Sequence, residues 1–113
     1  MQPSQIELLR HIVDECNYLL KEYQKNSYSD WVQNERLLRA VCRSLEIIGE
    51  ASNKISPDIK TAYRHIPWRE ISDMRNRIIH HYFGVDYDVV WNTIKTDIPS
   101  LREDIILIIK SAD

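Results

Sequence analysis

The stretch at residues 74–84, which reads M-R-N-R-I-I-H-H-Y-F-G, is the one around which the rest of the chain can be interpreted. Apolar residues in and before it recur at steps of three and four, which predicts one buried face of a helix. These residues are Ile71, Met74, Ile78 and Tyr82. The opposite face carries polar side chains, namely Asp73, Asn76, Arg77 and His80. We expect Gly84 to end this helix, because glycine readily adopts the left-handed conformation of a C-terminal cap.

The spacing of Arg75 and His80 creates a geometric conflict. Arg75 lies at the edge of the apolar stripe, and His80 follows five positions later. On a regular helix the two side chains therefore point about 140° apart. A second copy of the motif, related by a two-fold axis, would bring both residue types into one cleft. The spacing thus predicts a homodimer.

The chemistry of these side chains suits the cleavage of RNA. Arginine binds phosphate through its forked donors, and histidine can accept or donate a proton near neutral pH. RNA supplies its own nucleophile, the 2′-hydroxyl, so two histidines in a dimer suffice as base and acid. The sequence shows no cluster of carboxylates for a metal ion. We therefore predict a nuclease-like site with no metal and no cofactor, which leaves a 2′,3′-cyclic phosphate.

Each residue of this motif also has a structural alternative. Arg75 could pair with Asp73, Glu70 or a neighbouring helix, and His80 could be an ordinary surface histidine. Asn76 could simply be solvated, and Tyr82 could be a core aromatic residue. The spacing alone leaves these alternatives open.

The motif and its flanks resemble a known family. Arg75-Asn76, His80 and Tyr82 have the R-x4-H-x-Y form of the HepT family in the HEPN superfamily. The flanks are also similar: Pro67-Trp68, Gly84-Val85-Asp86 and Ile48-Gly49-Glu50-Ala51. The resemblance extends over residues 5–109. It implies an all-α, HEPN-like fold.

The resemblance also implies a function. Similar proteins are metal-independent endoribonucleases that act as toxins in type VII-like HEPN/MNT toxin–antitoxin pairs. The partner is a small nucleotidyltransferase, which neutralises the toxin by transferring AMP to the motif tyrosine. The implied roles are catalytic for Arg75 and His80, supporting or RNA-binding for Asn76, Arg77 and His81, and AMP acceptance for Tyr82. The same cluster could instead recognise nucleotide phosphate in a non-catalytic helical partner or scaffold of the nucleotidyltransferase.

Composition limits the remaining possibilities. With 113 residues, the chain has room for a single domain, which we place at residues 1–113. Two glycines and four prolines are too few for a many-turned β fold. The net charge of −2 gives no general attraction to RNA. Residues 64–81, however, hold four arginines against two carboxylates, a local net charge of +2.

The two cysteines and the apolar runs indicate the cellular compartment. Cys16 and Cys42 are isolated at apolar helical positions, which predicts reduced core residues rather than a zinc site or disulfide. The N-terminus lacks a signal pattern, and the longest apolar run, residues 105–109, is too short to span a membrane. We expect a cytoplasmic protein with no membrane contact.

The remaining periodicities predict an antiparallel four-helix bundle with one short extra helix. The first helix should begin at Ser4, with Glu7 completing a capping box, and the second should begin at Asp30 and continue to Ile55. In the second helix, Gly49, Ala51 and Ser52 form a patch of small residues that could admit a close neighbour.

The second half of the chain contains clear signals for the starts and ends of helices. Ser56 and Pro57 should begin the short helix, and Pro67 should open the motif helix at Trp68. Asp86 should cap the last helix, which Pro99 should kink or interrupt. Trp68 and Trp91 are best interpreted as core or interface anchors.

Overall fold

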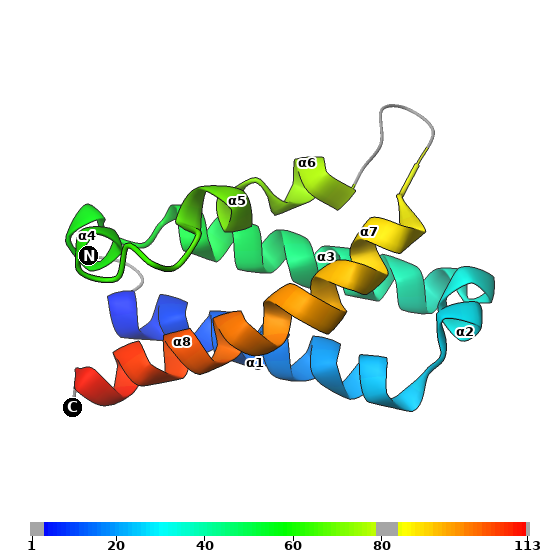
Figure 1. The fold of residues 1–113 in the computed structure, drawn as a ribbon, viewed down its shortest axis with the longest axis horizontal. Coiled ribbons are helices and arrows are strands. Elements are labelled where there is room, and N and C mark those ends of the chain that lie inside the picture. The colour runs from blue at the N-terminus through cyan, green and yellow to red at the C-terminus, as the bar shows by residue number, and fades with distance from the viewer. Residues whose placement is uncertain (1–3, 79–83, 113) are drawn as a thin grey trace.

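The computed structural model describes residues 4–78 and 84–112, which form four antiparallel limbs (Figure 1). The first limb is α1 (Gln5–Lys25) and the second is α3 (Glu35–Asn53). Helix α1 packs against α3 and against α8 (Ile98–Ser111). The third limb consists of α5 (Trp68–Ser72) and α6 (Met74–Ile78), both of which pack on α3. The fourth runs from α7 (Tyr87–Asn92) through the π-helical segment η1 (Thr93–Asp97) into α8. The predicted all-α, HEPN-like bundle is therefore confirmed.

Two short helices lie at the ends of the bundle (Figure 1). The predicted one is α4 (Pro57–Ala62), which begins where the Ser56 hydroxyl accepts a hydrogen bond from the Ile59 amide, 3.4 Å away. The second, α2 (Tyr28–Gln33), was not predicted. No helix in the described ranges is long and apolar enough to cross a membrane.

The core is formed by the apolar stripes that the sequence predicts. In α1, Leu9, Ile12, Cys16 and Leu19 are fully buried. Burial away from water disfavours a thiolate, and it raises the pKa of Cys16 to about 12 and that of Cys42 to about 11. Both cysteines are buried, so the prediction that they are core residues is confirmed.

The predicted cap of α1 is present in part. The Ser4 hydroxyl accepts a hydrogen bond from the Glu7 amide at 3.1 Å. The reciprocal bond from the Ser4 amide to the Glu7 carboxylate does not occur between these two described residues. Asp86 caps α7 as predicted, because its carboxylate accepts a hydrogen bond from the Val89 amide at 3.1 Å.

The predicted start of the second helix at Asp30 is wrong. A complete capping box forms one turn earlier, where the Ser27 hydroxyl accepts from the Asp30 amide and the Asp30 carboxylate accepts from the Ser27 amide. Asp30 is thus the third residue of α2 rather than a cap. Asn34 then interrupts the helix in an extended conformation and caps α3 by accepting a hydrogen bond from the Leu37 amide.

The prediction of one continuous motif helix is also wrong. Asp73 has φ −90° and ψ 16° and separates α5 from α6. Its carbonyl accepts hydrogen bonds from the amides of Asn76 and Arg77, and its carboxylate accepts one from the Asn76 side chain at 2.5 Å. Aspartate competes with a regular helix in this way because its side chain bonds to nearby groups. Gly84 does have a positive φ of 102°, but the predicted helix end at residues 79–83 lies outside the described residues.

Pro99 produces the predicted interruption of the last limb. Within η1 the Ile98 amide bonds to the Thr93 carbonyl five residues earlier, which makes one wide turn. Pro99 then occupies the first turn of α8. In a regular helix the proline ring would clash with the carbonyl four residues earlier, and a wider turn relieves that clash.

Candidate nuclease site

Helix α6 places the described part of the motif as the periodicity predicts. Met74 and Ile78 are buried in the core, whereas Arg75, Asn76 and Arg77 are exposed. The predicted site residues His80, His81 and Tyr82 lie outside the described residues. The predicted meeting of Arg75 with His80 in a two-fold cleft therefore stays a prediction.

Arg75 lies beside a hollow of about 340 Å³ between α3 and the junction of α5 and α6. The hollow is lined by Glu46, Gly49, Glu50, Asn53, Ser72 and Arg75. Among the described residues Arg75 forms no ion pair, so the alternative pairing with Asp73 or Glu70 is not found there. Within the described part of the chain, no hydrogen bond occupies the donors of its guanidinium, which suits them to a phosphate.

The charges around this hollow nearly cancel. Arg43 donates hydrogen bonds to Glu46 at 3.3 Å and to Glu50 at 3.2 Å, and these contacts raise its pKa. Two arginines thus face two carboxylates, which leaves no broad positive field to attract RNA. Binding of a phosphate here must depend on direct contact with Arg75.

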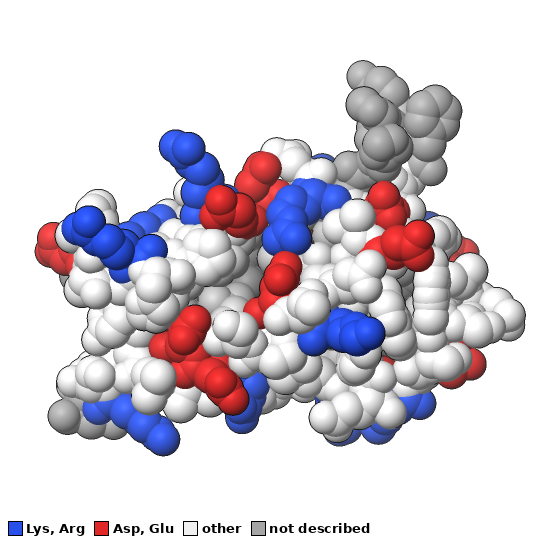
Figure 2. All heavy atoms as spheres, in the orientation of Figure 1, with Lys and Arg blue, Asp and Glu red and all other residues white. Residues whose placement is uncertain are grey.

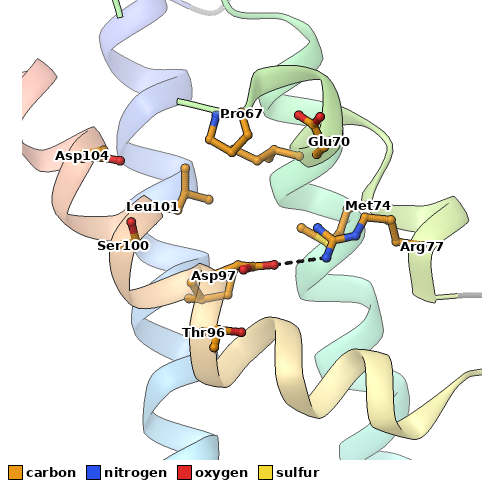
Figure 3. A pocket seen from close by; sticks show the side chains of 11 residues that line it. Pro67, Glu70, Met74, Arg77, Thr96, Asp97, Ser100, Leu101 and Asp104 are labelled. Atoms are coloured by element: carbon orange, nitrogen blue, oxygen red, sulfur yellow. Dashed lines mark hydrogen bonds and ion pairs between the residues drawn. The ribbon is translucent and has the colours of Figure 1, made fainter. Parts of the chain in front are cut away.

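Arg77 points to the other side of α6. Two residues after Arg75, it is rotated by about 200° on the helix. Its guanidinium donates a hydrogen bond to the Asp97 carboxylate of η1 at 3.1 Å, across a groove of about 460 Å³ (Figure 3). Glu70 and Asp104 also line this groove, and acidic and basic side chains are interspersed over this face (Figure 2). The structure thus separates Arg77 from the Arg75 hollow.

A backbone hydrogen bond joins the two residues that flank the segment 79–85. The Asp86 amide donates a hydrogen bond to the Ile78 carbonyl at 2.9 Å, and α6 packs against α7. Beyond this contact, α7 is anchored by aromatic residues. Trp91 packs against Tyr23, Tyr28 and Trp31, with ring centroids 4.6, 5.6 and 4.8 Å apart. The motif is therefore attached to the bundle at both of its ends.

The two predicted tryptophan anchors are confirmed. Trp68 is buried and donates a hydrogen bond from its indole Nε1 to the Tyr63 carbonyl at 3.1 Å. Trp91 is half-buried within the aromatic cluster. Both side chains are engaged in packing, as expected for structural residues.

The α3 side of the hollow was not recognised as part of the site from the sequence. Its polar residues Glu46, Glu50 and Asn53 fall on the exposed side of a strongly amphipathic helix, which is usually just solvated. The patch of small residues was the available signal, and Gly49 indeed admits a close neighbour. Within residues 4–78 and 84–112, no three His, Cys, Asp or Glu side chains lie close enough together to hold a metal ion.

Comparisons with known proteins identify the family. The family model described as ribonuclease HepT-like matches residues 9–108. A protein of Thermococcus cleftensis provisionally named ribonuclease HepT is 41% identical over 102 residues, covering 90% of this chain and 93% of that protein. A protein of Caldanaerobacter subterraneus provisionally named an RNase is 41% identical over 97 residues, covering 86% of this chain and 87% of its own length.

A third relative, from Methanocaldococcus jannaschii and also provisionally named an RNase, is 45% identical over 86 residues, covering 76% of this chain and 74% of the relative. No solved structure shows a significant match. The family match covers nearly the whole chain, including every residue of the motif. The chain therefore belongs to the ribonuclease HepT-like family of the HEPN superfamily.

Proposed function

We propose that this protein is a metal-independent endoribonuclease whose site is built from the R-x4-H-x-Y motif. The observation that carries the proposal is the state of Arg75. This side chain is exposed beside a hollow, on a helix that Met74 and Ile78 anchor in the core, and it has no ion pair among the described residues. Membership of a ribonuclease family supports RNA as the substrate.

The proposed reaction uses the substrate's own nucleophile. One His80 accepts the proton of the 2′-hydroxyl, whose oxygen attacks the adjacent phosphorus. The bond from phosphorus to the 5′-oxygen breaks, and a second, protonated His80 donates a proton to that leaving oxygen. Arg75 stabilises the extra negative charge on the pentacovalent phosphorane. The products are a 2′,3′-cyclic phosphate and a free 5′-hydroxyl.

A two-fold dimer supplies the second histidine of this scheme. Each chain contains one His80, and a single titrating group cannot be base and acid in the same step. Two motif segments facing one cleft would provide both groups and two copies of Arg75. Because the charges around one hollow nearly cancel, the second Arg75 would add positive charge to the shared cleft. Asn76, Arg77 and His81 are proposed to support the site or contact the RNA.

Cleavage in the presence of a chelator tests this function. Purified protein should cut RNA in excess EDTA and leave cyclic-phosphate ends, because no step requires a metal ion. The products can be identified by mass spectrometry of a short defined RNA. If EDTA stops the reaction and added magnesium restores it, the proposed mechanism is wrong. A protein that binds the RNA without cutting it would favour the non-catalytic scaffold instead.

We further propose that the protein is the toxin of a type VII-like HEPN/MNT toxin–antitoxin pair. Its partner would be a nucleotidyltransferase that transfers AMP to the Tyr82 hydroxyl. Tyr82 lies two residues after His80 and seven after Arg75 in the sequence. A bulky adduct with a negative phosphate would compete with the RNA phosphate for Arg75, by the same charge effect as phosphorylation.

Intact mass measurement tests this modification. Co-expression with the partner nucleotidyltransferase should add one or more AMP units to the protein, mapped to Tyr82 by peptide sequencing. The Tyr82→Phe variant should gain no mass and should stay toxic in the presence of the partner. If the partner neutralises the protein while Tyr82 remains unmodified, inhibition is by steric masking and the proposal fails.

A further inference from the structure

Gly49 on α3 lies against the backbone of the limb formed by α5 and α6, here called the motif limb. A Cβ atom added to Gly49 would lie 3.1 Å from the Ile71 carbonyl oxygen, 3.3 Å from the Ser72 carbonyl oxygen and 3.4 Å from the Met74 Cβ. The first two distances are tighter than ordinary van der Waals contact, and both involve backbone atoms that cannot rotate away. The motif limb rests on α3 at this distance only because Gly49 lacks a side chain.

The atoms that Gly49 contacts lie at the junction from which Arg75 projects. Ile71 and Ser72 end α5, Asp73 breaks the helix, and Met74 begins α6. Arg75 follows directly and lines the same hollow as Gly49. A displacement of the two carbonyls by a few tenths of an ångström therefore reaches the Arg75 backbone within three or four residues. The Met74 Cβ, which a side chain at position 49 would also contact, lies on α6 itself beyond the break at Asp73, one residue from Arg75.

We infer that Gly49 is a positioning residue of the nuclease site, which sets the place of Arg75 by allowing close contact between α3 and the α5–α6 junction. The inference rests on the proposed function. Gly49 does not touch the substrate, and it acts through Arg75. Glycine within a helix is less favourable than alanine by about 1 kcal/mol, so the formation of α3 alone would favour alanine at position 49. The close approach of the junction gives a reason to retain it.

A double-mutant cycle separates this role from a general structural one. Gly49→Ala should lower kcat by about 10-fold, since a misplacement of about 1 Å costs about 100-fold and the expected shift is smaller. Arg75→Lys keeps the charge and leaves residual activity for measurement. In the Arg75→Lys background, Gly49→Ala should lower kcat by less than about 2-fold, because the group it positions is already altered.

Ser52→Ala is the matched control. Ser52 lies one turn later on α3, is fully buried, and its hydroxyl has no hydrogen-bond partner in the described structure. This substitution should leave kcat within about 2-fold of the unmodified protein in both backgrounds. Additive effects of Gly49→Ala and Arg75→Lys would overturn the inference, as would an unchanged kcat in Gly49→Ala. Loss of helical circular dichroism in Gly49→Ala would assign Gly49 to folding and also overturn it.

A second measurement keeps this inference distinct from the proposed function. The Nε–H resonance of Arg75 in a two-dimensional NMR spectrum should shift in Gly49→Ala and stay in place in Ser52→Ala. If the unmodified protein does not cut RNA, the proposed function fails, and the resonance still shows whether Gly49 positions Arg75. If the protein cuts RNA and the resonance is the same in both variants, only the role of Gly49 is wrong.

Discussion

Replacing Arg75 with alanine should lower the rate of RNA cleavage by at least about 100-fold, because the charge on the phosphorane would lose a pre-placed cation. Stability should change little, since Arg75 is exposed and forms no ion pair among the described residues. His80→Ala should be at least as severe. Cleavage of a fluorescent RNA and urea denaturation measure the two effects separately.

The matched control for Arg75→Ala removes an equal charge elsewhere. Arg39 on α3 is exposed and, within residues 4–78 and 84–112, pairs only with Glu35, so Arg39→Ala should leave cleavage within about 2-fold. Arg77→Ala should have an intermediate effect, because Arg77 already bonds to Asp97 on the other side of α6. If Arg75→Ala and Arg39→Ala lose the same activity, Arg75 contributes only to general attraction and not to the reaction.

Mixing subunits tests the shared cleft. If both histidines of a dimer serve one reaction, a dimer with one His80→Ala subunit is inactive. An equal mixture, unfolded and refolded together, should then retain about one quarter of the activity of the unmodified protein, whereas independent sites would retain about one half. Light scattering that shows a monomer at micromolar concentration would also exclude the shared cleft.

Replacing Trp31 with alanine should lower the free energy of unfolding by about 3–5 kcal/mol. Trp31 is 2% exposed and packs edge-on against Trp91, with ring centroids 4.8 Å apart. Its loss would leave a cavity between α2 and α7. Since a domain of this size is stable by about 5–15 kcal/mol, the variant should unfold at a much lower urea concentration.

Trp31→Phe is the control for this prediction. The Trp31 Nε1 group is buried without a hydrogen-bond partner in the described structure, so phenylalanine sacrifices no polar contact. The cost should be below about 2 kcal/mol, because most of the aromatic packing is kept. If Trp31→Ala costs less than about 1 kcal/mol, the aromatic cluster does not anchor α7 as proposed.

Much of this architecture could be predicted because the helices carry strong local signals. The stripes of α1, α3 and α8 and the caps at Ser4, Ser56 and Asp86 are confirmed. The interruption at Pro99 could also be predicted, because a proline ring is incompatible with the interior of a regular helix.

The breaks at Asn34 and Asp73 could not be predicted in the same way. Aspartate and asparagine are tolerated within helices at a cost of less than about 1 kcal/mol, so their effect depends on tertiary contacts. The residues on either side of Asp73, which are Ile71, Ser72 and Met74, lie against Gly49 of α3, far away in the sequence. Nothing in the local pattern of residues 68–78 contains that information. The hollow beside Arg75 is not predictable for the same reason, because four of its six lining residues belong to α3.

The wide turn of η1 has a consequence for the evolution of this chain. It holds one more residue than a regular helical turn, which is the form expected when a single residue is inserted into a helix and accommodated locally. Because the wide turn absorbs the extra residue, deleting one residue from Thr93–Asp97 should restore regular hydrogen bonding with little change in the phase of α7 against α8. Deleting one residue from the first regular turns of α8 would instead rotate α7 against the rest of α8 by about 100°. Trp91 would then leave the aromatic cluster while α8 kept its place on α1. A change of one residue in this limb is therefore accommodated best within the wide turn Thr93–Asp97, where it leaves the phase between α7 and α8 nearly unchanged.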